Sequence, residues 1–515
     1  DSGAASMPIE PDGFNDPNEL ITGITYVKAP EVVRMFETLM GKEAFVRALQ
    51  NYHDKYKHAN ATRAQWVAEM EKESELDFQN FAQRWLKQTN YPIVTIKKSY
   101  DKANKELRIT FAQKNETFWE LPLVYTIYGE NGKVLFSGTH WMKEKQEIQV
   151  HRGIEEPKVI SFNQGYSFYG KVVYDAHLEE LYEQVRSDKD TIGRYLAFYQ
   201  IADRLKENLC RNPDNEVDVD FIDLFYELFS DAELSKSLGA QMIAIFESAE
   251  NEEFEHQYDL LYQVREKIFK AIAQKYESEL YQIYEANQKT IDAPYVETQV
   301  FEIKQRQVKN TALGILTRLD NEKVQKTIRA QYKNANHVSD RVSALRLYLK
   351  TSAKDKYDIL MEYEQHARHS LVSWETFLAI TAGNDSEDAL DIIKRVEKLE
   401  DFHIEQTNDQ RALYARFAMN KKKSLLTEEG REFLKERILK LATINQFNTL
   451  HLIKALSNID KIQEKHQVAL VDILVQVLKK IDQKQAPSVY NTTKRILVNS
   501  KKSVGLYEKK KGKIK

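Results

Sequence analysis

The chain has 515 residues, of which 42% are hydrophobic and 30% are charged, with a formal net charge of -3 at pH 7. This composition is typical of a globular protein and excludes a largely disordered chain. The charge balance gives no general electrostatic reason to bind nucleic acid, and no apolar run approaches the roughly 20 residues that span a membrane. We therefore expect neither a nucleic-acid nor a membrane partner, and roughly three domains by length.

Residues 1–92 are expected to be helical after an initial loop. The pattern predicts an extended approach through Tyr26 and then a helix opened by Pro30, because the first helical turn does not need the amide hydrogen that proline lacks. Apolar residues follow with helical spacing at Val32, Val33, Phe36, Leu39 and Met40. Taken alone, Tyr26 is most simply a packing residue at a helix start.

Two further helices are predicted before residue 92. Thr62 and Gln65 have the spacing of a capping box, in which each side chain satisfies an exposed backbone amide of the other. A short helix then carries Phe78, Phe81 and Trp85.

From residue 93 to 174 the hydrophobic period changes to two. Apolar residues alternate at Leu107, Ile109 and Phe111, and again at Leu121, Leu123, Tyr125 and Ile127. Asn131 and Gly132 form a strong hairpin signal, since both positions favour positive φ. Further strands are expected at residues 147–151 and 158–162. This segment therefore predicts a small antiparallel β-sandwich.

Residues 175–515 carry helical periodicity with few interruptions, at Pro213, Pro294 and Pro487. No strict repeat is visible, so we expect an irregular stack of helix pairs resembling HEAT or armadillo arrays, which curve into a concave surface. The whole chain is thus predicted to be multidomain and mainly α. Cys210 is the only cysteine, which excludes an intrachain disulfide and favours a cytoplasmic location.

The pair His366 and His369 has a spacing that a metal can use. Without a nearby third ligand, a solvated helix end is the better interpretation. The lysines after residue 508 are interpreted as a solvated tail. We therefore predict no metal site within the chain itself.

The stretch from Tyr26 to Pro92 resembles the end of the catalytic domain of the aminopeptidase N family, which are thermolysin-like gluzincin zinc metallopeptidases. The family's Tyr-x-Lys helix start corresponds to Tyr26 and Lys28, although Val27 replaces a glutamate and Ala29 and Pro30 replace Gly-Ala. Residues 159–167 look like the motif that closes the family's β-sandwich, and residues 190–195 also fall in register. The resemblance implies three parts: the end of the catalytic domain (1–92), a β-sandwich (93–174) and a helical superhelix (175–515).

The resemblance also implies functional residues. In the family the tyrosine donates a hydrogen bond to the oxyanion formed when zinc-bound water attacks the peptide carbonyl, so Tyr26 is the catalytic candidate. Arg411 matches an Asn-x-x-Arg helix that lines the substrate chamber in relatives, His451 falls where some relatives place another arginine, and Asn18 falls in family register. These three are the candidate substrate-binding residues. For Arg411, an ordinary surface arginine is an equally good explanation.

The family's metal-binding half is not found in the sequence. None of the twelve histidines begins a His-Glu-x-x-His motif, whose two imidazoles bind zinc and whose glutamate acts as general base. The Gly-x-Met-Glu-Asn loop that captures the substrate amino terminus is also missing.

We therefore expect the carboxy-terminal portion of a cytoplasmic zinc aminopeptidase that acts on short peptides. Zinc would be bound by a missing amino-terminal catalytic segment, so this portion alone is expected to hold no cofactor and to be inactive. The alternative is a noncatalytic module, a β-sandwich plus helical repeats that bind peptides or proteins.

Overall fold

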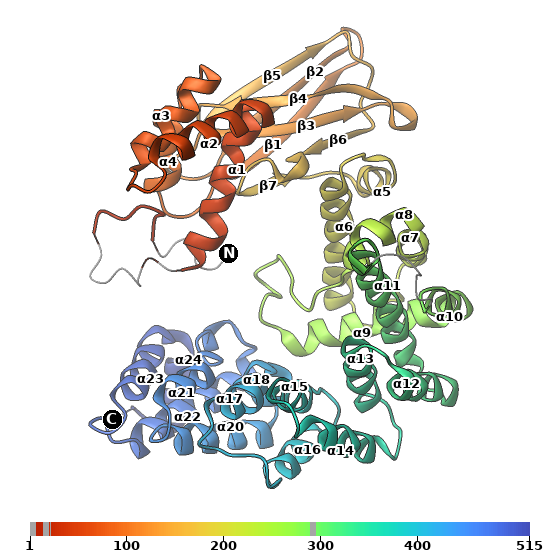
Figure 1. Ribbon diagram of the computed structural model, residues 1–515, viewed down its shortest axis with the longest axis vertical. Coiled ribbons are helices and arrows are strands. Elements are labelled where there is room, and N and C mark those ends of the chain that lie inside the picture. The colour runs from red at the N-terminus through yellow and green to blue at the C-terminus, as the bar shows by residue number, and fades with distance from the viewer. Residues whose placement is uncertain (1–6, 14–19, 21, 289–294, 515) are drawn as a thin grey trace. The chain divides into compact units, whose positions relative to one another are not determined.

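The computed structural model describes residues 7–13, 20, 22–288 and 295–514 (Figure 1). The chain divides into two compact units, residues 1–201 and 202–515, and the division falls in sequence within helix α6 (Thr191–Arg211). The first unit combines short helices with two small sheets, and the second is helical. This confirms the predicted multidomain, mainly α fold. The described residues include no helix with the length and apolar character needed to cross a membrane.

The first unit begins with a helical layer. A π-helical turn (Ile24–Lys28) leads directly into α1 (Ala29–Met40), and three helices follow: α2 (Lys42–Tyr56), α3 (Arg63–Ser74) and α4 (Gln79–Lys87). The predicted capping box is confirmed at the start of α3, where Gln65 N–H donates to Thr62 Oγ1 at 3.3 Å and Thr62 N–H to Gln65 Oε1 at 2.8 Å. The helix predicted to carry Phe81 and Trp85 is α4, and both side chains are fully buried.

The predicted extended approach to Tyr26 is wrong. The backbone is already helical at Gly23, and the Ile24 N–H group is capped by Thr22 Oγ1 at 3.2 Å. The helix therefore begins before Pro30 rather than at it, although Pro30 does lie in the first turn of the regular α-helix. Val33 is also not part of the buried face that we predicted, since it is 41% exposed and Met35 is buried instead.

Seven strands form a β-sandwich, with bounds and order as follows: β1 (Ile93–Asp101), β2 (Glu106–Gln113), β3 (Leu121–Tyr128), β4 (Val134–Met142), β5 (Gln146–Arg152), β6 (Val159–Phe162) and β7 (Lys171–Tyr174). One sheet has the order β5-β2-β1-β7 and the other β4-β3-β6. All pairs are antiparallel except β1 with β7, which is parallel. Asn131 and Gly132 adopt the predicted positive φ, at 54° and 68°, in the turn between β3 and β4.

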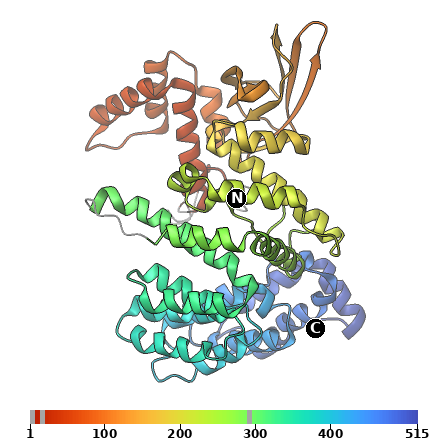
Figure 2. The same ribbon diagram turned by 90° about the vertical axis from the view of Figure 1, so that its right-hand side faces the viewer.

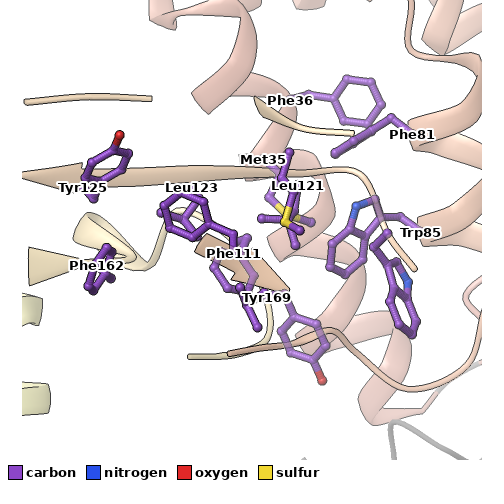
Figure 3. Packing of buried hydrophobic residues seen from close by; sticks show 14 of the residues in the cluster. Met35, Phe36, Phe81, Trp85, Phe111, Leu121, Leu123, Tyr125, Phe162 and Tyr169 are labelled. Atoms are coloured by element: carbon purple, nitrogen blue, oxygen red, sulfur yellow. The ribbon is translucent and has the colours of Figure 1, made fainter. Parts of the chain in front are cut away.

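One hydrophobic core joins the helical layer to the sandwich. Phe36 on α1 packs against Phe78 and Phe81, with ring centroids 4.7 and 5.0 Å away. The same cluster continues through Trp85 to strand residues such as Phe111 (Figure 3). The core therefore fixes α1 and α4 against the sheets.

After the sandwich, α5 (Leu178–Ser187) completes the first unit together with the beginning of α6. The helices of the second unit are α7 (Val219–Ser230), α8 (Ala232–Leu238), α9 (Tyr258–Lys275), α10 (Glu277–Ala286), α11 (Tyr295–Leu316), α12 (Glu322–Asn334), α13 (Val338–Leu349), α14 (Lys356–Ala367), α15 (Leu371–Ala382), α16 (Ala389–Val396), α17 (Thr407–Asp409), α18 (Arg416–Met419), α19 (Lys421–Ser424), α20 (Glu428–Leu441), α21 (Gln446–Lys454), α22 (Glu464–Lys480), α23 (Pro487–Asn499) and α24 (Lys501–Lys511). Successive helices from α12 to α16 pack on one another, as Figure 2 shows for the green-to-blue part of the chain. This stacking confirms the predicted armadillo-like arrangement.

The second unit departs from a simple repeat stack in one region. Residues 247–258 lie against helices far along the chain, where Lys422 Nζ is 2.8 Å from Glu247 Oε2 and Lys461 Nζ is 3.0 Å from Glu255 Oε2. Lys421 Nζ also donates to Tyr258 Oη at 2.9 Å. In an ideal solenoid each repeat contacts only its neighbours, so these contacts tie distant repeats together.

Candidate functional site

Tyr26 lies in the π-helical turn and points away from the core. Its side chain is 70% exposed, whereas Ile24 and Lys28 at the ends of the turn are 2% and 0% exposed. Residues two positions apart on a helical turn face roughly opposite sides, so burial of the two ends holds the tyrosine outward. The turn is therefore anchored at both ends and presents a phenol to its surroundings.

Pro30 gives a physical reason for the wider turn. A proline ring in a helix clashes with the carbonyl group four residues earlier, which here belongs to Tyr26, and it cannot donate a hydrogen bond to that group. The structure instead bonds the Ala29 N–H group to Ile24 O, five residues back. Single π-helical turns of this kind are often found at functional sites.

Lys28 is the residue at this site whose importance the sequence analysis missed. Its Nζ donates to the backbone carbonyl of Gln88 at 2.7 Å, and Gln88 is the residue that ends α4. Burial lowers the pKa of Lys28 to about 8. The hydrogen bond to Gln88 places the ammonium group at the carboxyl end of α4. The helix dipole and unbonded carbonyl groups at such an end favour a cation and so partly offset the cost of burial. The signal that could have identified this lysine is the Tyr-x-Lys helix start itself, in which Lys28 is the second matching residue.

The pKa of Lys28 predicts how stability changes with pH. Because this pKa is about 8 in the folded protein and about 10.4 in an unfolded chain, the unfolded state binds more protons between these values. The free energy of unfolding should therefore rise as pH increases from 8 to 10.4, by at most about 3 kcal/mol. Urea unfolding at pH 7.5 and 9.5 measures the change. Lys28→Met, in which other titrating groups are unaltered, should lack this component of the rise, and an equal rise in both proteins would contradict the assignment.

The stretch that resembles the family's sandwich-closing motif contacts α1, the helix that follows the turn of Tyr26. Arg34 on α1 donates to Gly165 O at 3.1 Å and also to Tyr166 O. Inside the motif, Asn163 Oδ1 accepts hydrogen bonds from Ser167 Oγ and the Phe168 N–H group, both at 3.0 Å. The two stretches that carried the resemblance are thus in direct contact.

Arg411 and His451 lie on neighbouring elements of the second unit. Arg411 is in another π-helical turn (Gln410–Ala415), and His451 is on α21 with its ring edge-on to Phe447 at 5.0 Å. The two elements are joined by a 2.7 Å hydrogen bond from Asn448 Nδ2 to Gln410 Oε1. Asn18 lies outside the described residues.

The environment of Arg411 leaves its guanidinium available to a ligand. The side chain is 61% exposed, and its ion pair with Glu375 spans 3.5 Å. Exposed pairs of this kind contribute little free energy, so they exchange partners readily. Tyr26 and Arg411 occupy the two π-helical turns of the described residues. The substrate-binding roles of Arg411 and His451 stay predictions.

Within the described ranges, no three or more His, Cys, Asp and Glu side chains come together in a group that could hold a metal ion. A zinc site needs three or four such ligands. The described residues therefore do not fit a zinc ion. What they offer chemically at Tyr26 is an exposed hydrogen-bond donor on a fixed turn.

Three family models match the chain in succession. They are the peptidase family M1 domain over residues 1–85, a domain of unknown function with an Ig-like fold (DUF3458) over residues 90–175, and a domain of unknown function with ARM repeats (DUF3458_C) over residues 178–497. The third covers more than half of the chain. The matches follow one another without overlap along almost the whole sequence.

Curated relatives and a solved structure extend this likeness. The chain is 23% identical to aminopeptidase N of Escherichia coli K12 over 93% of its length, and 24% identical to aminopeptidase N of Haemophilus influenzae over 91%. It spans only 57% and 56% of these two relatives. The crystal structure of Legionella pneumophila aminopeptidase A in complex with aspartic acid matches the fold with a TM-score of 0.79 at 18% identity, covering 94% of this chain and 58% of that one.

Proposed function

Because the chain belongs to the aminopeptidase N family, we propose that it is the carboxy-terminal portion of a zinc-dependent aminopeptidase that removes amino-terminal residues from short peptides. The succession of three family models and the aminopeptidase relatives support this proposal. The single structural observation that carries it is the exposed phenol of Tyr26 on a turn anchored at both ends. We further propose a cytoplasmic location, which the lone cysteine supports.

Tyr26 is proposed to stabilise the transition state. Attack on a peptide carbonyl places negative charge on its oxygen, and a donor that is already in position stabilises that charge without reorganising. The anchored turn supplies this preorganisation, since neither the backbone nor the buried ends of the turn need to move. The phenol hydroxyl would donate to the oxyanion and keep its own proton.

Zinc and its ligands are proposed to belong to an amino-terminal catalytic segment that this chain lacks. The metal would activate the attacking water when bound. The described residues contain no suitable ligand group, so the chain by itself is proposed to be inactive. Its partners are then this segment and the peptide substrates.

The proposal is tested by comparing this chain with the full-length gene product. Both are assayed for hydrolysis of amino-acid p-nitroanilides and short peptides, and both are analysed for bound zinc. Turnover and zinc only in the full-length protein are the expected result. If the full-length protein binds no zinc and hydrolyses none of these substrates, the noncatalytic module becomes the better interpretation.

The role of Arg411 is tested with substrates that differ at the carboxyl terminus. A charged hydrogen bond to a carboxylate contributes about 1.5 to 3 kcal/mol. In the full-length protein, Arg411→Ala is therefore expected to raise KM about 10-fold or more for peptides with a free carboxylate and to leave KM for peptide amides unchanged. The exposed Arg495 provides a control, and Arg495→Ala should change neither value. An equal effect of Arg411→Ala on both substrates would contradict carboxylate binding.

A further inference from the structure

We propose that Lys28 is a positioning residue for Tyr26: its amino group holds the carboxyl end of α4 and thereby fixes the turn that presents the phenol. This inference rests on the proposed function, because Lys28 affects catalysis only if Tyr26 has the catalytic role proposed above. It concerns only residues of this chain and needs no contact with substrate or metal.

The first step is the unusual environment of Lys28. The side chain is fully buried, and among the described residues its hydrogen bond is to Gln88 O at 2.7 Å, 60 residues away in sequence, with no carboxylate ion-paired to it. A buried charge without a partner is strongly destabilising, so such lysines are retained only where their environment compensates them. Here the compensation comes from the carbonyl group of Gln88, the C-cap residue of α4.

The second step is that α4 is itself held firmly. Trp85 Nε1 donates to Glu120 O at 2.6 Å, and Arg84 Nη1 donates to Phe118 O at 3.1 Å. The side chain of Gln88 also donates to Phe118 O, at 3.3 Å. The carbonyl group that Lys28 binds therefore directly follows a helix that is bonded to the segment just before β3, and Lys28 transmits that fixed position to the turn.

The third step is that Tyr26 depends on the turn for its direction. Its side chain is exposed, and its backbone N–H group bonds to Thr22 O at a long 3.3 Å. Lys28 is two residues away and points to the opposite side, toward the core. Rotating the turn about its axis would break the Lys28 hydrogen bond and move the phenol at once. The lysine thus couples the direction of Tyr26 to the position of α4.

Hydrogen exchange on this chain tests the coupling without any enzyme assay. Lys28→Met keeps the length of the side chain and removes the donor, and Lys42→Met is a matched control at an exposed lysine. We expect Lys28→Met to speed exchange of the amides in residues 24–29 about 10-fold or more relative to wild type, with strands β2 and β3 unchanged, and Lys42→Met to have no effect. Unchanged exchange in residues 24–29 of Lys28→Met would overturn the proposal.

A second variant covers the case in which Lys28→Met does not fold. Lys28→Arg keeps the charge but alters the reach of the donor, so it should raise exchange in the same turn by a smaller factor. Exchange equal to that of wild type would count against the proposal.

Kinetics of the full-length protein then separate positioning from general support of the fold. Lys28→Met should lower kcat about 10-fold or more with KM and zinc content unchanged. The double variant with Tyr26→Phe should be no slower than Tyr26→Phe alone, because both changes remove the same interaction. Additive losses would overturn the positioning role. A wild-type full-length protein without turnover would instead refute the proposed function, while the exchange result would still report on the coupling.

Discussion

Replacing Tyr26 by phenylalanine in the full-length protein is expected to lower kcat about 100- to 1,000-fold, the usual cost of losing one preorganised oxyanion donor. The ring is retained and only the hydroxyl group is removed. Because the side chain is 70% exposed, the fold should not depend on that hydroxyl. The change therefore isolates the proposed catalytic hydrogen bond.

The kinetic pattern identifies the kind of interaction that is lost. A bond made only in the transition state lowers kcat and kcat/KM by the same factor and leaves KM unchanged. Bound zinc, measured by metal analysis, should also be unchanged. Tyr52 on α2 offers a matched control, and Tyr52→Phe should leave turnover as it is in wild type. If Tyr26→Phe turns over substrate at the wild-type rate, the catalytic role of Tyr26 is refuted.

The second large effect is expected from Trp85→Ala, which should reduce the free energy of unfolding of the first unit by about 3 to 5 kcal/mol. The side chain is fully buried, lies 6.1 Å from Trp119 between ring centroids, and donates a 2.6 Å hydrogen bond to Glu120 O. Truncation leaves a large cavity and an unpaired carbonyl group. The loss should also loosen α4, and with it the carbonyl group that Lys28 binds.

Tryptophan fluorescence during urea unfolding measures this effect. Four of the five tryptophans, Trp66, Trp85, Trp119 and Trp141, lie in residues 1–201, so the signal reports mainly on the first unit. Trp66 is only partly buried, so Trp66→Ala should lower the free energy of unfolding clearly less than Trp85→Ala does. Equal decreases in the free energy of unfolding for the two variants would contradict the claim that Trp85 stabilises the packing of α4 against the sandwich.

Local patterns predicted much of the first unit because each of these features depends on residues that are close together in the sequence. The capping box at Thr62 needs only residues three apart, and the alternation in β2 follows from the one buried face of that strand. The hairpin at Asn131 likewise depends on the φ preferences of two adjacent residues. Each of these features was found where the sequence placed it.

Features that depend on distant partners could not be predicted in the same way. The hydrogen bond of Lys28 is made to Gln88, 60 residues away, and no local pattern encodes it. The parallel pairing of β7 with β1 depends on how the chain returns to the sheet, which strand periodicity does not reveal. At Tyr26 the error was to treat Pro30 as a helix start, although proline in a first turn is also compatible with a wider turn before it.

The contacts of residues 247–258 with Lys421, Lys422 and Lys461 have a consequence for how the helical unit comes apart. An open stack of repeats can fray from either end, since each pair of helices is held only by the next. Here the final third of the chain is tethered to the beginning of the same unit. The helices between Lys422 and Lys461, α20 and α21, should therefore unfold only when their contacts with residues 247–258 also break, whereas α22, α23 and α24 follow the last contact and can fray independently of it.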